Sequence, residues 1–293
     1  MIYNHKLIND LAWVIGSPSL IGTADYNDQR LLTDSWFNNQ LKNSANILSE
    51  EDKNPQRIQA YLSTMPEFKL GLYFEKLIHY WLSINPQFDI MRNNLIVSSE
   101  KITLGEFDFI IKDHQTGRTV HLEVAVKFFL EIINDKKSCW VGPNTRDRLD
   151  LKVDKLLNQQ IELSNSSLVK SQLKQQNINI DDHWVILKGR LFKNSNKLES
   201  GCCWLSISDF MHSQNSDSLW LILDKPHWLS AISNVSEHFL AAQLYQKKEL
   251  LAVLHETIDE RPVCIAKIDD DKETKRFFIT ANDWQKKALN SLG

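Results

Sequence analysis

Two neighbouring segments carry charged side chains among residues that are otherwise strongly apolar. Glu106 and Asp108 alternate with phenylalanines, and Glu123 and Lys127 lie in a run rich in valine and phenylalanine. Side chains alternate between the two faces of a strand, so Asp108, Glu123 and Lys127 are expected on one surface of a hairpin, with the phenylalanines on the other. Charges are costly to bury unless they are paired or bind a metal, which makes this surface a candidate site.

The chemistry of such a site follows from its charges. Two carboxylates that converge from neighbouring strands repel each other, and a divalent cation relieves that repulsion. Mg²⁺ or Mn²⁺ would suit the site, because hard cations prefer carboxylate oxygens and water. Lys127 would then face negative charge that develops on a phosphate. The alternative is a salt-bridged hairpin that faces solvent, in which Glu123 pairs with Lys127 or Lys112.

The hydrophobic pattern predicts the elements that position these residues. Apolar residues recur at helical spacing before and after three strand-like runs, and a turn ending in Gly117 joins the last two runs. Residues 164–179, rich in serine, asparagine and glutamine, are predicted to form a solvated connection. The predicted elements are a helix, three strands, a helix and a strand, at residues 68–84, 88–97, 103–112, 119–130, 146–163 and 184–192.

Each predicted helix carries one polar residue next to its apolar stripe. Glu75 flanks the stripe of the first helix and can face the sheet. Gln160 projects from the middle of the stripe of the second helix, where an amide must find a partner or line a site. The alternatives are an ordinary flanking glutamate and a glutamine bonded to the backbone.

The second helix and the loop before it also carry basic residues that could contact phosphates: Arg146, Arg148, Lys152 and Lys155. The alternative is a solvated helix face whose charges pair with nearby aspartates. A local patch of this kind would be needed for a nucleic-acid partner, because the net charge of −3 gives no global electrostatic case for one.

The order of elements resembles the common core of the PD-(D/E)XK nuclease superfamily, with an acid on the first helix, an aspartate on the second strand and a glutamate and lysine on the third. That resemblance implies an α/β fold with a restriction-endonuclease-like core and an α+β C-terminal elaboration. Residues 71–75, 105–108, 122–130 and 142–144, with the helix that follows, more closely resemble the bacterial domain-of-unknown-function family 1853.

The resemblance also implies roles for individual residues. Asp108 and Glu123 would bind Mg²⁺ or Mn²⁺, Glu75 would be an accessory ligand through water, and Lys127 would be the catalytic lysine. Gln160 would match the helix glutamine of the RecB-type branch. The usual motif places the lysine two residues after the acid, where this chain has Ala125. Lys127 lies one strand repeat further on the same face, a gap that a lysine side chain can span.

The implied activity is metal-dependent hydrolysis of phosphodiester bonds in DNA or RNA. The alternative is a catalytically inactive module on the same fold that binds nucleic acid or a protein partner. The displacement of the lysine favours the inactive module, whereas the set of Asp108, Glu123 and Gln160 favours the enzyme.

Composition describes an ordinary folded protein: 293 residues, 42% hydrophobic and 24% charged. No apolar stretch of about 18 residues occurs and no signal sequence is apparent at the start, so we expect a cytoplasmic protein without a membrane partner. The four cysteines lack metal-ligand spacing and are expected to be reduced thiols. The expected segments are an N-terminal helical extension (1–65), the nuclease-like core (66–195) and a C-terminal α+β region (196–293).

The C-terminal region contains fewer clear signals. Residues 219–223 have the composition of a buried strand. Residues 261–268 and 276–280 are predicted to form a hairpin around an acidic turn, and Asp283 is predicted to cap a final helix.

Overall fold

The structure is a computed structural model that describes residues 3–22, 26–65, 68–100, 102–194, 201–213, 218–238, 243–258 and 261–292. Within these residues the chain forms two compact units. The N-terminal unit covers residues 3–126 and 152–188, and the C-terminal unit covers residues 127–151 and 189–292. The two predicted boundaries, after residues 65 and 195, adjoin residues outside the described ranges.

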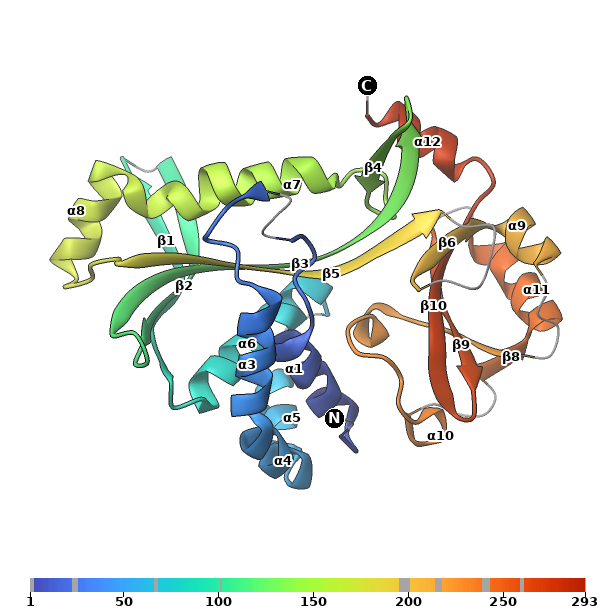
Figure 1. Cartoon of the computed structure of the whole chain (residues 1–293), viewed down its shortest axis with the longest axis horizontal. Coiled ribbons are helices and arrows are strands. Elements are labelled where there is room, and N and C mark those ends of the chain that lie inside the picture. Colours follow the sequence, from blue (N-terminus) through green and yellow to red (C-terminus); the bar gives the residue numbers. More distant parts are fainter. Residues whose placement is uncertain are drawn as a thin grey trace. The chain divides into compact units, whose positions relative to one another are not determined.

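The N-terminal unit is a sheet covered by helices. Its strands lie in the order β1-β2-β3-β5, and β1, β2 and β3 form an antiparallel meander. Helices α1 and α3 to α6 lie on one side of these strands, and α8 lies on the other (Figure 1). Its strands and α-helices are α1 (Lys6–Gly16), α3 (Asp34–Asn43), α4 (Ala45–Lys53), α5 (Gln56–Leu62), α6 (Leu70–Ile84), β1 (Phe88–Ser99), β2 (Ile102–Asp113), β3 (Arg118–Asn134), α7 (Leu149–Lys155), α8 (Ser167–Gln175) and β5 (Asp182–Asn194). Of these, β3, α7 and β5 continue across the division between the units.

The three predicted strands and the turn between the last two are confirmed. Asp113 organises that turn, because its carboxylate accepts hydrogen bonds from the N–H groups of Gln115 (3.1 Å) and Thr116 (3.3 Å). Gly117 follows with a φ of +71°, a conformation that glycine adopts without strain. The turn therefore sets the register of β2 against β3.

The predicted second helix is shorter and less regular than its periodicity indicates. α7 begins at Leu149 and is followed by a π-helical turn, Leu156–Gln160, and a 3₁₀ turn, Ile161–Asn165. The expectation of a solvated connection over 164–179 is wrong, because α8 forms there. Val169 and Leu173 are four residues apart and bury one side of α8, a pattern masked by the polar residues around them.

The C-terminal unit contains the strand order β6-β10-β9-β7-β8, in which β6 and β10 are parallel and the other pairs are antiparallel. The predicted strand and hairpin are confirmed as β7 and as β9 with β10. A short strand, β4 (Lys137–Val141), pairs antiparallel with the end of β3. The remaining elements are β6 (Cys203–Ser206), α9 (Ile207–His212), β7 (Leu219–Ile222), a 3₁₀ turn (Lys225–His227), α10 (Val235–His238), β8 (Leu244–Gln246), α11 (Lys247–Thr257), β9 (Val263–Asp269), β10 (Lys272–Thr280) and α12 (Trp284–Asn290).

The final helix begins where the sequence predicts, directly after Asp283. The predicted cap itself is wrong: the Asp283 side chain accepts no cap hydrogen bond and pairs instead with Lys287, one turn further on, at 2.8 Å. The C-terminal unit contains both helices and strands, and the protein as described has the mixed α/β architecture that the sequence predicts.

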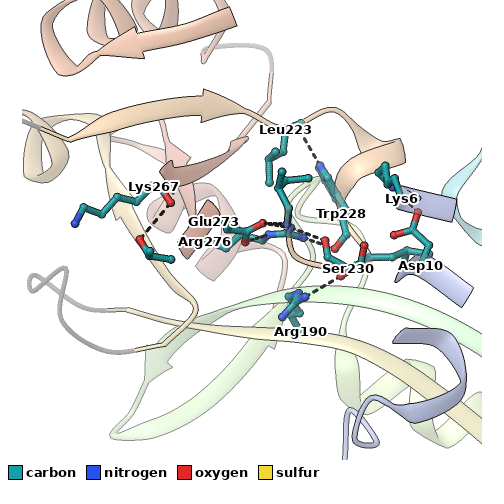
Figure 2. A network of polar contacts seen from close by, with 12 residues as sticks. Lys6, Asp10, Arg190, Leu223, Trp228, Ser230, Lys267, Glu273 and Arg276 are labelled. Atoms are coloured by element: carbon teal, nitrogen blue, oxygen red, sulfur yellow. Dashed lines mark hydrogen bonds and ion pairs between the residues drawn. The ribbon is translucent and has the colours of Figure 1, made fainter. Parts of the chain in front are cut away.

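A buried arginine organises the core of the C-terminal unit (Figure 2). Arg276 on β10 is 2% exposed, and its guanidinium donates to Glu273 at 2.6 and 2.7 Å. It also donates to the carbonyl oxygens of Trp228 and, at 2.9 Å, Ser230. Arg190 on β5 donates to the carbonyl oxygen of Leu229 at 2.7 Å. These bonds fix the loop around residue 229, which has no regular secondary structure to satisfy its carbonyls.

Candidate acidic site

Asp108 and Glu123 are brought together by the register of β2 and β3. Strand pairing ends at Phe109 opposite Leu122, and one further step along the same register places Asp108 opposite Glu123. At that step the Asp108 side chain replaces the backbone ladder, because its Oδ2 accepts a hydrogen bond from the Val124 N–H at 2.9 Å. The convergence of the two carboxyl groups that the sequence predicts is therefore present in the N-terminal unit.

The alternation of β2 is interrupted at this position. Phe107 and Ile110, which regular alternation would place on opposite faces, lie in one apolar cluster with Val169 of α8. Phe109 lies on the side of α6, where its ring is 6.1 Å from that of His79. The expectation that Phe107 and Phe109 share a face is wrong, because the regular alternation of side chains between the two faces of β2 is broken at Asp108.

Glu123 is fully buried, and each of its carboxylate oxygens has a partner. The Nε2 atom of His121 lies 2.9 Å from Oε1, and the side-chain amide of Gln160 donates to Oε2 at 3.0 Å. Burial lowers the pKa of His121 to about 3, so the ring is neutral at neutral pH. The predicted site does not include His121, although its spacing of two from Glu123 places both side chains on one face of a strand.

The two carboxyl groups share an environment that disfavours negative charge. Burial, and then repulsion from Glu123, raises the pKa of Asp108 to about 8, although the Val124 N–H opposes this. Burial likewise raises the pKa of Glu123 to about 7, against the effect of hydrogen bonding by Asp108. At neutral pH the pair therefore still binds a proton, whereas two exposed carboxyl groups would have released theirs.

Lys152 is a cation that acts on both carboxyl groups. Its positive charge lowers the pKa of Asp108 and that of Glu123. Lys152 Nζ donates to Gln160 Oε1 at 3.2 Å, and the same amide group of Gln160 donates to Glu123. Gln160 therefore bridges an ammonium and a carboxylate, which fixes the orientation of its amide.

This bridge depends on the irregular helix. Residues eight apart on an α-helix point about 80° away from each other, because each residue turns the helix by about 100°. The π-helical turn Leu156–Gln160 contains more residues per turn and so rotates less per residue. It brings Gln160 round to the side of Lys152. No sequence pattern of α-helical spacing would have paired these two residues.

Glu75 lies close enough to act on Asp108, but its side chain is held by a residue outside the pair. Its negative charge contributes to the raised pKa of Asp108. Its Oε1 accepts a hydrogen bond at 2.8 Å from Asn94, a residue of β1 with a φ of +48°. Asn94 tolerates this left-handed conformation better than most residues. Its role as an accessory ligand through water stays a prediction.

Lys127 belongs to the C-terminal unit, where its Nζ donates to Asp147 at 2.9 Å. Both side chains are partly exposed, at 31% and 45%, and ion pairs of this kind contribute little to stability. The catalytic role of Lys127 stays a prediction.

The four basic residues predicted to contact phosphates are divided between the units: Arg146 and Arg148 lie in the C-terminal unit, and Lys152 and Lys155 in the N-terminal unit. Arg148 donates to Asp150 at 2.6 Å, so part of its charge is neutralised locally. Arg146 and Lys155 are exposed. Their contact with nucleic acid stays a prediction.

The described residues bear on ligands and on membranes in two respects. Among them, no group of three or more histidine, cysteine, aspartate or glutamate side chains is arranged to hold a metal ion. No helix among them is long and apolar enough to cross a membrane.

The fold and the site define a mixed α/β protein with a large mixed sheet, in which adjacent strands hold a buried and a partly buried carboxyl group. The model of the family described as a domain of unknown function, DUF1853, matches residues 9–280. The chain belongs to this family, as the resemblance in its motifs predicts. Comparison with curated proteins and with solved structures gave no match.

Proposed function

We propose that the protein is a metal-dependent nuclease of the PD-(D/E)XK type and that Asp108 and Glu123 bind its metal ion. The observation that carries this proposal is the carboxyl pair itself: two acids face each other across adjacent strands, Glu123 is buried and Asp108 partly buried, and both have a raised pKa. Perturbed acids of this kind cluster at functional sites. The observed elements α6, β1, β2, β3, α7 and β5 follow one another in the predicted order, with β4 inserted after β3 and α8 before β5, and this order supports the nuclease-like core.

The donor set fits Mg²⁺ or Mn²⁺. Mg²⁺ is commonly bound through one or two carboxylates, with water and substrate phosphate as its remaining ligands. Two carboxyl groups are therefore sufficient, and a third protein ligand is not required. A bound divalent cation would activate water and stabilise charge on the phosphate. The residues of the chain orient the site: His121 and Gln160 hold Glu123, and the Val124 N–H holds Asp108.

Cleavage by the purified full-length protein tests the proposal. Labelled single-stranded DNA, duplex DNA and RNA would be incubated with Mg²⁺, with Mn²⁺ or with EDTA. We expect cleavage that requires a metal ion and is abolished in Asp108→Asn and in Glu123→Gln. Both variants keep the shape of the side chain. Cleavage that survives both substitutions, or no cleavage of any of the substrates, contradicts the proposal.

A second candidate function is a catalytically inactive module on the same fold that binds nucleic acid or a protein. One observation favours it: both oxygens of Glu123 already have protein partners. The two candidates differ in their response to metal. Calorimetry with Mn²⁺ distinguishes them, because only the nuclease requires binding that is lost in Asp108→Asn.

A further inference from the structure

A cation lies beside the acidic pair, but it comes from a helix instead of from β3. Lys152 is half-buried on α7 and acts electrostatically on Asp108 and on Glu123. The lysine that the resemblance assigned to catalysis, Lys127, directs its Nζ to Asp147 at 2.9 Å. The sequence predicts Lys127 to be catalytic and Lys152 to contact phosphates in general. In the structure, Lys152 is the one of these two that acts on both acids.

A specific contact holds Lys152 in place. Its Nζ donates to Gln160 Oε1 at 3.2 Å, while Gln160 Nε2 donates to Glu123 at 3.0 Å. A lysine that only attracted the nucleic-acid backbone would not need a partner that also contacts an acid of the site. The π-helical turn that permits this bridge supports the same conclusion, because such turns occur frequently at functional sites.

We infer that Lys152, held by Gln160, is the catalytic lysine of the acidic site and contacts the phosphate that is cleaved. This inference rests on the proposed nuclease function. In the reaction, a water oxygen forms a bond to phosphorus while the bond from phosphorus to one ester oxygen breaks. The water gives one proton to a carboxylate of the pair, and the departing ester oxygen takes one proton from solvent. Lys152 remains charged throughout and stabilises the additional negative charge on the non-bridging phosphate oxygens. Gln160 is a positioning residue.

Kinetics with the full-length protein and labelled DNA test this role. We expect Lys152→Gln to lower kcat by about 100- to 1,000-fold with little change in KM, because the lost contact acts on charge that develops during the reaction. Lys152→Arg keeps the charge and should recover part of the rate. Lys127→Gln should cause a smaller loss than Lys152→Gln, and Lys170→Gln, an exposed substitution on α8, should leave the rate unchanged.

A measurement without metal or substrate tests the location of the lysine. In EDTA at pH 8, Lys152→Gln should lower Tm more in the wild-type background than in the Glu123→Gln background, because the two charges interact. Lys127→Gln should lower Tm equally in both backgrounds. Equal losses for Lys152→Gln in the two backgrounds would place it away from the pair and overturn the inference.

The outcomes separate this inference from the proposed function. Cleavage by the wild type together with undiminished kcat in Lys152→Gln overturns the role of Lys152 and leaves the nuclease intact. A larger loss in Lys127→Gln than in Lys152→Gln does the same and favours the lysine of β3. No cleavage by the wild type overturns the nuclease and, with it, the catalytic role of Lys152.

Discussion

Replacing Asp108 by asparagine should stabilise the metal-free protein at neutral and alkaline pH. The pKa of this carboxyl group is raised from 3.8 to about 8, and each pK unit corresponds to about 1.4 kcal/mol. At pH 7 the group is protonated in the folded state and ionised in the unfolded state, which lowers the free energy of unfolding by on the order of 4 kcal/mol. Asparagine removes this penalty and can still accept the hydrogen bond from Val124.

The pH dependence has a defined sign. The folded state binds more protons than the unfolded state between pH about 4 and about 8, so the stability of the wild type falls as pH rises through that range. The advantage of Asp108→Asn should therefore grow from pH 5 to pH 8 and then level off. Urea unfolding in EDTA at several pH values measures it.

A matched substitution on the same strand gives the control. Asp113 is also buried, but its carboxylate accepts hydrogen bonds from the turn, including the Gln115 and Thr116 N–H groups. Asp113→Asn should destabilise the protein by about 1–3 kcal/mol, because one oxygen is replaced by a donor that faces other donors. A wild type more stable than Asp108→Asn at pH 8 would refute the reasoning about the acidic pair.

Three further outcomes are expected. Mn²⁺ binding at pH 7 should release protons, because the ion displaces them from the Asp108 and Glu123 carboxyl groups. Calorimetry in buffers of different ionisation enthalpy measures this release, and a heat of binding that is independent of the buffer would contradict the prediction. Gln160→Leu should lower the free energy of unfolding by about 1–3 kcal/mol, since it leaves a Glu123 oxygen unpaired, whereas a substitution with no effect in urea would argue against the bridge. Arg276→Met should cost about 3–5 kcal/mol by leaving Glu273 buried without its partner, and adding Glu273→Met should recover part of that loss.

The strands and the acidic pair could be predicted because they depend on local patterns. Alternation and the turn ending at Gly117 predicted β2 and β3, and their register then brought Asp108 opposite Glu123. The change of facing at Asp108 could not be predicted, because it depends on a side chain that replaces a backbone hydrogen bond. Such a replacement leaves no periodic signal.

The helical segments near the site could be predicted less completely than the strands. Gln160 was recognised as a polar residue in an apolar stripe, which is a local observation. Its contact with Lys152 depends on a π-helical turn, and patterns based on 3.6 residues per turn cannot detect a change in helix phase. The composition of 167–175 concealed α8 for a related reason, since two buried residues are too few to dominate a polar segment.

The π-helical turn has a consequence for how the site is encoded along the chain. Such a turn amounts to one additional residue in an α-helix. Deleting one residue within Leu156–Gln160 would restore regular winding and leave Gln160 seven residues after Lys152, a separation that turns an α-helix to within about 20° of two full turns. The two side chains would therefore stay on one side of the helix. The π-helical turn thus accommodates one additional residue without turning Gln160 away from Lys152, and relatives that lack this residue would keep the contact between ammonium and amide on a regular helix.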